Sequence, residues 1–229
     1  PVPVGDVMRA FAVGKIVKSN HSDFREGEIV SGLFGWQRYA VSNGSSVVTR
    51  MADIDKPPSY ALGILGLNGI TAYCGLIYQG KPKPDETVVV STAAGSVGSC
   101  VGQIAKIKGC RTVGITGGPA KAQQCLDEFG YDVSIDYKNT DDLSMSVSEA
   151  CPDGVDIYFD NTCGPISDIV MENLNAHARV IICGTASVPD WVPIPLGPRV
   201  QRQLLVNRAQ MSGLLIFDYK EYYAEAIQK

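Results

Sequence analysis

Two alanines and two closely spaced glycines interrupt the stretch "VVVSTAAGSVGSCVGQIAKIKGC", residues 88–110, between a β-forming run and a helical pattern. The spacing Ala93-x-Gly95-x-x-Gly98 at a strand-to-helix junction is the context of a dinucleotide-binding loop. Side chains larger than alanine would block the approach of a pyrophosphate, while free N–H groups at residues 96–99 would attract it. The first glycine of the usual pattern is alanine here, so a plain packing turn is the alternative interpretation.

The end of the following strand-like run carries no acidic residue. In NAD-binding loops of this kind a carboxylate stands about 20 residues after the glycines and binds the ribose hydroxyls. Here that place reads "GITGGPAK", with Gly117 and Gly118 where the acid would be and Lys121 in the first turn of the next helix. A missing anion and an added cation favour a 2′-phosphate, so the pattern predicts NADP rather than NAD. A solvated surface lysine is the alternative for Lys121.

Further candidate residues stand at the ends of later strand-like runs. Asn161 follows "VDIYFD" and Cys183 follows "RVII", which places both at the carboxyl edge of a parallel sheet, where ligands bind. Asn161 fits either a bond to a cofactor ribose or amide, or an ordinary turn. Tyr137 fits either stacking on an adenine or closure of the core, and the sequence alone favours the core.

Metal and nucleophile chemistry find little support. His21 and His177 are the two histidines, far apart and without ligands at metal-binding spacing, and no G-x-S-x-G pattern occurs. The balance of 20 basic against 24 acidic residues, without a basic run, argues against nucleic acid as a partner. Seven cysteines without a C-x-x-C pair, and no apolar span long enough for a membrane, predict buried thiols in a cytoplasmic protein.

The elements that must position these residues change character along the chain. Short apolar or alternating runs at residues 8–18, 26–32 and 36–42 predict a small β-rich region. A helix capped by Ser59 is expected next, with breaks at Gly66 and Gly69. Six strand-like runs with helical patterns between them then predict a parallel α/β sheet; they lie at residues 87–90, 112–116, 133–137, 155–160, 179–183 and 211–217.

Five blocks in order, "LNGITAYCGL", "STAAGSVGSCVGQIAKIKGCRTVGITGG", "GVDIYFDN", "RVIICGTAS" and "MSGLLIFDY", resemble the zinc-independent medium-chain dehydrogenase/reductases. Within them the resemblance is to the prostaglandin reductase, leukotriene dehydrogenase and curcumin reductase group. It implies an enzyme that uses NADPH to reduce the C=C bond of α,β-unsaturated ketones or aldehydes, of the 2-alkenal or 15-oxoprostaglandin type. It also implies an α/β fold: a Rossmann-like parallel sheet beside a GroES-like β-rich region.

The resemblance assigns cofactor contacts to the glycine loop and to the strand ends. These residues are Ser96, Val97, Gly98, Ser99, Gly118, Lys121, Tyr137, Asn161, Cys183, Gly184, Thr185, Ala186, Ser187, Leu214, Leu215, Ile216 and Phe217. Some members carry a tyrosine that polarises the substrate carbonyl just before the sixth strand, where this chain has Val206. No catalytic residue is therefore named. No metal ligand is named either, because the two histidines are isolated.

Compared with the group, the chain is expected to start inside the GroES-like domain and to stop before its returning strands. This gives a partial GroES-like catalytic region at residues 1–56 and an NADP-binding Rossmann domain at 57–229, truncated at its C-terminal end. Unpaired strand edges favour a homodimer. Two alternatives to the enone reductase stay open: an NADPH quinone reductase on the same scaffold, and an NADPH-binding protein without catalysis.

Overall fold

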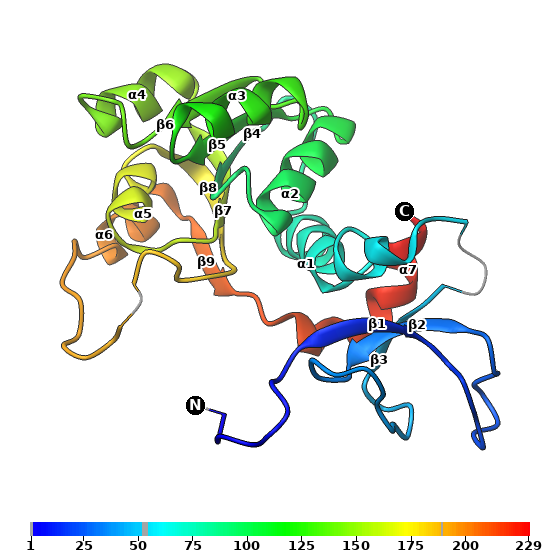
Figure 1. Cartoon of the computed structure of the whole chain (residues 1–229). Coiled ribbons are helices and arrows are strands. Elements are labelled where there is room, and N and C mark those ends of the chain that lie inside the picture. The colour runs from blue at the N-terminus through cyan, green and yellow to red at the C-terminus, as the bar shows by residue number, and fades with distance from the viewer. Residues whose placement is uncertain (1, 52–54, 189) are drawn as a thin grey trace. The chain divides into compact units, whose positions relative to one another are not determined.

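The computed structural model describes residues 2–51, 55–188 and 190–229. The chain forms two compact units, Pro1–Ile70 with Glu221–Lys229 and Thr71–Lys220 (Figure 1). Within the three described ranges, no helix has the length and apolar character that crossing a membrane requires.

The first unit is built on a three-stranded antiparallel sheet in the order β1-β2-β3. Its strands are β1 (Phe11–Lys15), β2 (Ile29–Leu33) and β3 (Val47–Arg50). β1 and β2 pair in register from Phe11 opposite Leu33 to Lys15 opposite Ile29. The predicted β-rich region at the start of the chain is confirmed.

The run at residues 36–42 forms no strand, so its inclusion among the β-forming runs was wrong. Gly35 has a φ of +75°, which turns the chain after β2. The Gln37 side chain then donates a 2.7 Å hydrogen bond to the Phe34 carbonyl and closes the turn. The third strand is β3, whose sequence "VVTR" is rich in β-branched residues.

Helical structure follows with different boundaries from those predicted. It consists of the 3₁₀ helix η1 (Pro58–Leu62), α1 (Leu67–Cys74) and the π-helix η2 (Gly75–Gly80). The predicted cap at Ser59 is wrong, because η1 begins at Pro58 and no side chain caps it. The predicted break at Gly69 is also wrong. Gly69 lies inside α1, where a Cβ would collide with the Ile64 carbonyl, so the glycine permits close packing.

The second unit contains a six-stranded sheet in the order β6-β5-β4-β7-β8-β9, with every pair parallel. The strands are β4 (Thr87–Ser91), β5 (Arg111–Thr116), β6 (Val133–Asp136), β7 (Val155–Asp160), β8 (Leu174–Ile182) and β9 (Gln210–Gly213). Counted along the chain this is the strand order 3-2-1-4-5-6 of the dinucleotide-binding Rossmann fold. The predicted Rossmann-like parallel sheet is confirmed.

Helices cover both faces of this sheet, as Figure 1 shows for α2 on one side and for α5 and α6 on the other. The helices are α2 (Ser96–Ile107), α3 (Pro119–Asp127), α4 (Leu143–Ala150), α5 (Gly164–Met171) and α6 (Gln201–Asn207). Val89 of β4 joins the core beneath α4 and α5, whereas Val88 and Val90 join the core beneath α2. Every residue of β4 is buried because both faces are covered.

The sixth strand ends earlier than predicted. The run at residues 211–217 was expected to be extended throughout, but β9 stops at Gly213 and the 3₁₀ helix η3 (Ile216–Tyr222) follows. The Leu214 N–H still donates 2.8 Å to the Ile182 carbonyl. β8 ends at Ile182, so residues 215–217 have no strand to pair with among the described residues. The chain turns into η3, ahead of α7 (Tyr223–Gln228).

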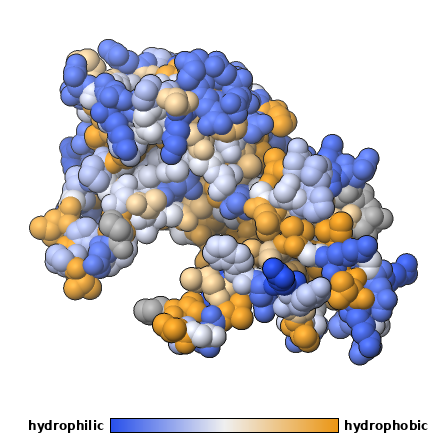
Figure 2. All heavy atoms as spheres, in the orientation of Figure 1, coloured by the Kyte–Doolittle hydropathy of each residue, from blue (hydrophilic) through white to orange (hydrophobic). Residues whose placement is uncertain are grey.

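The loop between β8 and α6 carries several apolar side chains on the surface. Figure 2 shows hydrophobic residues gathered along this loop. Trp191 is 52% exposed, Val192 81%, Ile194 77% and Leu196 98%.

Candidate functional site

The predicted site residues meet at the carboxyl edge of the parallel sheet. β4 and β7 are neighbours, and the strands that follow each of them run outward in opposite directions along the sheet. At such a reversal of strand order the connecting loops leave a crevice, in which nucleotides bind. The glycine loop follows β4, Asn161 follows β7 and Cys183 follows β8, so the fold places them at one edge.

The loop after β4 is held tightly against the start of α2. The Gly95 N–H donates 2.8 Å to the Thr92 carbonyl, and Gly95 caps α2 without a side-chain hydrogen bond. A Cβ on Gly98 would collide with the same Thr92 carbonyl and would lie 2.9 Å from the Ala93 Cα. Gly98 is therefore the glycine that lets the helix approach the strand.

The first turn of α2 limits which predicted contacts are open to a phosphate. The Ser99 N–H donates 2.8 Å to the Gly95 carbonyl, so the N–H is not open to a ligand. The Ser99 hydroxyl makes only a long hydrogen bond, 3.5 Å to the Ser96 carbonyl. The N–H groups of Ser96, Val97 and Gly98 precede the first intrahelical bond, and they point out of the helix end. The contacts predicted at this loop therefore correspond to the three main-chain N–H donors and the hydroxyls of Ser96 and Ser99.

Tyr131 supports this helix from beneath and was missed by the sequence analysis. Its buried hydroxyl donates 2.7 Å to the Gly98 carbonyl. A Cβ on Gly102 would collide with its ring, and a Cβ on Gly114 would lie 3.2 Å from it. Burial raises the pKa of Tyr131 well above the ordinary tyrosine value, which keeps the hydroxyl a donor. The one indication in the sequence that a large side chain packs here is the pair Gly102 and Gly114, which have no side chains of their own.

A carboxylate does lie beside the acid-free end of β5, but it comes from β6. Asp136 accepts hydrogen bonds from the Gly118 N–H at 2.7 Å, the Lys138 N–H at 3.1 Å and the Asn139 side chain at 2.5 Å. These bonds, with that from Gly118 foremost, lower the pKa of Asp136. The Gly118 N–H is thereby occupied, so Gly118 contributes room and a φ of +97° rather than a donor.

Tyr137 follows Asp136 directly and is 39% exposed, so its ring does not close the core. Its N–H donates 3.0 Å to the Thr116 carbonyl, which fixes it beside the end of β5. Lys121 lies in the first turn of α3 with an exposed side chain. Among the residues that the structure describes, it takes part in no salt bridge.

Asn161 joins the two strands at the reversal point. Its side-chain amide donates 2.8 Å to the Ser91 carbonyl, and its N–H donates 2.8 Å to the Ser91 hydroxyl. The amide nitrogen is thus committed to the neighbouring strand, while the side-chain oxygen can still accept. Both interpretations of Asn161 from the sequence remain compatible with this geometry.

Asp160, next to Asn161, is fully buried and organises the loop after β7. Its Oδ1 accepts hydrogen bonds from the Tyr158 hydroxyl at 3.0 Å, from Thr162 N–H at 2.8 Å and from Cys163 N–H at 2.9 Å. Its Oδ2 has no partner among the described residues. Burial, and then the Asp160 charge, raise the pKa of Cys183 to about 11, so this thiol stays protonated at neutral pH.

The run at residues 183–187 follows β8 and pairs with the loop after β7. Cys183 and Gly184 donate their N–H groups to the Asp160 carbonyl at 2.8 and 3.1 Å. Further on, Ala186 donates 3.2 Å to the Asn161 carbonyl and Ser187 donates 2.9 Å to the Thr162 carbonyl. This stretch is therefore positioned by the main chain, with Thr185, Ala186 and Ser187 exposed.

The segment after β9 divides into inward and outward side chains. Ile216 is buried, whereas Leu215 is 58% exposed and Phe217 49%. Gln79 of η2 holds the end of β9 by donating to the Gly213 carbonyl at 3.1 Å and to the Tyr219 hydroxyl at 2.9 Å. Nothing in the local sequence singles out Gln79, because its partners lie more than 130 residues away.

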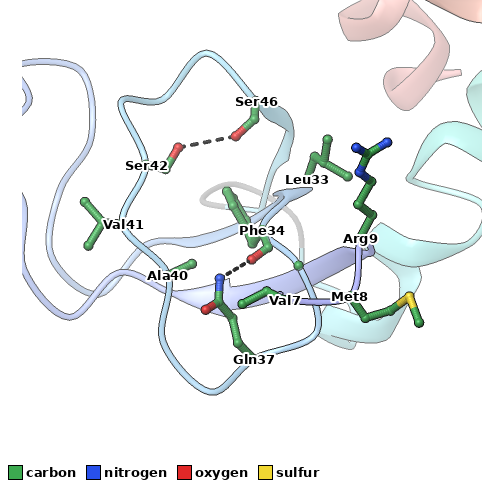
Figure 3. A pocket seen from close by; sticks show the side chains of 11 residues that line it. Val7, Met8, Arg9, Leu33, Phe34, Gln37, Ala40, Val41, Ser42 and Ser46 are labelled. Atoms are coloured by element: carbon green, nitrogen blue, oxygen red, sulfur yellow. Dashed lines mark hydrogen bonds between the residues drawn. The ribbon is translucent and has the colours of Figure 1, made fainter. Parts of the chain in front are cut away.

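The first unit contains a separate cavity of about 290 Å³ (Figure 3). Arg9 is the one charged side chain among the described residues that line it, and Ser42 and Ser46 bond to each other at 3.3 Å. None of the predicted site residues lines this cavity. In the described ranges no group of three His, Cys, Asp or Glu side chains is arranged to hold a metal.

Comparison with known proteins gives the chain its family. Residues 96–229 match the family described as "Zinc-binding dehydrogenase", and residues 1–49 match "N-terminal domain of oxidoreductase". The NADPH-dependent curcumin reductase of Escherichia coli is 41% identical over 220 residues, covering 94% of this chain and 63% of that protein. The NADP(+)-dependent 2-alkenal reductase of Nicotiana tabacum is 36% identical over 98% of this chain and 65% of its own length.

The chain thus spans less than two thirds of the length of these two relatives. Among solved structures, that of CurA from Vibrio vulnificus in complex with NADPH superimposes with a TM-score of 0.87 at 41% identity. The match covers 100% of this chain and 68% of that one. The chain belongs to the zinc-binding dehydrogenase family of medium-chain dehydrogenase/reductases, in the group that includes the curcumin reductases.

Proposed function

We propose that this chain uses NADPH to reduce a carbon–carbon double bond conjugated to a carbonyl. The observation that carries the proposal is the superposition of the whole chain on CurA bound to NADPH, at 41% identity. The relatives named as curcumin reductase and 2-alkenal reductase support the substrate class, since those names denote reduction of enones and enals. Substrates of the 15-oxoprostaglandin type also have a C=C bond conjugated to a carbonyl, so they belong to the same substrate class.

The residues present fit this cofactor. The start of α2 offers main-chain donors with no side-chain cap, and Gly98 keeps the helix against the strand. We infer that Ser96, Val97 and Gly98 hold the pyrophosphate there, since helix N-termini bind anions. Ser99 adds its hydroxyl.

At the outer strands, we assign the adenosine end of NADPH to the turn after β5. Gly118 leaves open space, because a Cβ at this position would have no atom within 4 Å, and Lys121 supplies charge for the 2′-phosphate. Tyr137, partly exposed beside this turn, offers its ring face to the adenine.

At the inner strands, Asn161 offers its side-chain oxygen to the ribose or amide. We assign the nicotinamide side to the two strand-end segments that border it, namely Cys183, Gly184, Thr185, Ala186 and Ser187 with Leu214, Leu215, Ile216 and Phe217.

When bound, NADPH would supply a hydride for the β-carbon of the substrate. The protein's part is then to hold the enone near the donor and to stabilise the negative charge that gathers on the carbonyl oxygen. Val206, where some members of the group carry a tyrosine, has no proton to donate and is 56% exposed in α6. The proton donor is therefore sought in another polar group or in ordered water.

The proposal extends to the domain boundaries, the oligomeric state and the cellular location of the protein. We assign residues 1–56 to part of a GroES-like catalytic region and residues 57–229 to the NADP-binding domain. A homodimer is supported by β9, whose four residues are exposed and which pairs with β8 alone in the sheet. A cytoplasmic location is supported by seven free cysteines, five of them buried.

Two measurements on the purified chain test the proposed function. Fluorescence titration should give tighter binding of NADPH than of NADH, because Lys121 is proposed to bind the extra phosphate. Turnover should then appear with 2-alkenals and α,β-unsaturated ketones. Turnover with quinones alone would identify a quinone reductase, and binding without turnover of either acceptor would identify a non-catalytic NADPH-binding protein.

A further inference from the structure

A second lysine lies against the turn that Gly117 and Gly118 form after β5, here called the glycine turn. A Cβ placed on Gly117 would lie 3.1 Å from Cε of Lys138 and 3.0 Å from Cε1 of Tyr137. The ammonium group is one bond beyond Cε, so the charge of Lys138 is carried close to this turn. Sequence spacing offers no hint of this contact, because Lys138 lies about 20 residues downstream of the turn.

Main-chain bonds fix the base of the Lys138 side chain. The Lys138 N–H donates 3.1 Å to Asp136 Oδ1, the same oxygen that accepts the Gly118 N–H at 2.7 Å. The two segments are thereby tied together through one carboxylate. Lys138 is exposed and takes part in no salt bridge among the described residues, which leaves its ammonium group open to a ligand.

The charges around the glycine turn favour two lysines over one. Asp136 brings a carboxylate to the turn, and the hydrogen bonds that lower its pKa keep it ionised. Lys121 alone would only balance that charge. Lys121, in the first turn of α3, and Lys138, against Gly117, together exceed the charge of Asp136 by one positive charge, which suits a doubly charged phosphate ester.

We propose that Lys138 is a second determinant of specificity for the 2′-phosphate, acting together with Lys121. The inference rests on the proposed use of NADPH and adds a residue to that site. It also assigns Asp136 a positioning role: its oxygens are occupied by N–H donors, so it shapes the turn instead of binding ribose hydroxyls as the acid of an NAD site does.

The test uses the adenosine fragment 2′,5′-ADP and, as a matched ligand without the 2′-phosphate, 5′-AMP. Calorimetric titration of Lys138→Ala should show about 10-fold weaker binding of 2′,5′-ADP, with 5′-AMP little changed. Lys138→Arg should retain most of the affinity, and Lys121→Ala with Lys138→Ala should lose more than either alone. Lys108→Ala, at an exposed lysine after α2, serves as the control and should bind as the wild type does.

Two results overturn the inference. If Lys138→Ala binds 2′,5′-ADP as the wild type does while Lys121→Ala does not, Lys138 has no role and the proposed cofactor stands. Equal losses for 2′,5′-ADP and 5′-AMP would show a structural effect on the whole adenosine site. If the wild-type chain binds neither 2′,5′-ADP nor NADPH, the proposed function itself fails.

Discussion

The hydroxyl of Tyr131 donates a 2.7 Å hydrogen bond to the main-chain carbonyl of Gly98, at the point where α2 meets the glycine loop. This bond joins the segment that follows α3 to the helix that is proposed to hold the pyrophosphate. The shape of that site therefore depends on a buried side chain from outside the loop.

Tyr131→Phe keeps the ring and removes the bond. We expect the free energy of unfolding to fall by about 1 kcal/mol, a typical value for a buried hydrogen bond. Gly102→Ala should be more damaging, about 1 to 3 kcal/mol, because its Cβ would collide with the Tyr131 ring. Urea denaturation measures both. Wild-type stability of Gly102→Ala would contradict the packing described for Tyr131.

Asn161→Ala removes the hydrogen bond that the side-chain amide, just after β7, donates to the Ser91 carbonyl of β4. The free energy of unfolding should fall by about 1 kcal/mol, because Asn161 links the two strands. NADPH should also bind more weakly, since Asn161 is proposed to contact the cofactor. Asn161→Asp should be worse, because a carboxylate would face the Ser91 carbonyl beside buried Asp160. A loss of stability with unchanged NADPH affinity would reduce Asn161 to a structural link.

Glu86 and Arg179 should make stability depend on pH. Arg179 binds Glu86 through two nitrogens, at 2.6 and 2.9 Å. Burial raises the pKa of Glu86, but hydrogen bonds from Arg179 and the Lys83 N–H outweigh it, so the pKa lies below its usual 4.5. A lowered carboxylate pKa stabilises the folded chain above pH 4.5, and this stabilisation is lost as the pH falls through the folded value.

Glu86→Gln is therefore expected to lower the free energy of unfolding by about 1 to 2 kcal/mol at neutral pH. The difference from wild type should shrink as the pH falls below 4.5. Denaturation at a series of pH values measures this. A difference between the two proteins that does not change with pH would show that the charge of Glu86 is not what stabilises the fold.

Chelators should leave activity unchanged despite the family's description as zinc-binding. The two histidines are far apart in sequence, and no metal-holding group occurs in the described ranges. An enone also needs less activation than an alcohol, because its β-carbon is already electrophilic. Stoichiometric zinc in the purified protein, removed together with activity, would overturn this expectation.

Local pattern was enough to predict the sheet of the second unit. Continuous apolar runs separated by helical patterns are typical of strands covered on both faces, and the six parallel strands confirm this. The same rule failed after Gly213, because residues 214–217 are apolar but have no neighbouring strand beyond Ile182. The end of a strand depends on its partner, which local composition does not contain.

Positions at the carboxyl edge of the sheet could be predicted from the sequence, while the roles of the residues there stay predictions. Gly98 lies in the first turn of α2 and Asn161 directly after β7, as the sequence pattern predicts. Asp136, Lys138 and Tyr131 were missed because each acts on a segment about 20 to 33 residues away in sequence. Such contacts between distant segments form only when the helices and loops pack onto the sheet. No fixed sequence separation predicts them from a single sequence.

The most direct test of the account is the fate of the hydride. NADPH deuterated at C4 is incubated with the purified chain and a 2-alkenal, and the product is analysed by NMR and mass spectrometry. We predict a saturated aldehyde with deuterium at the β-carbon and an intact carbonyl group. Deuterium on the hydroxyl-bearing carbon of an allylic alcohol, or the absence of deuterium from the products of every enal and enone tried, would contradict the proposed reaction.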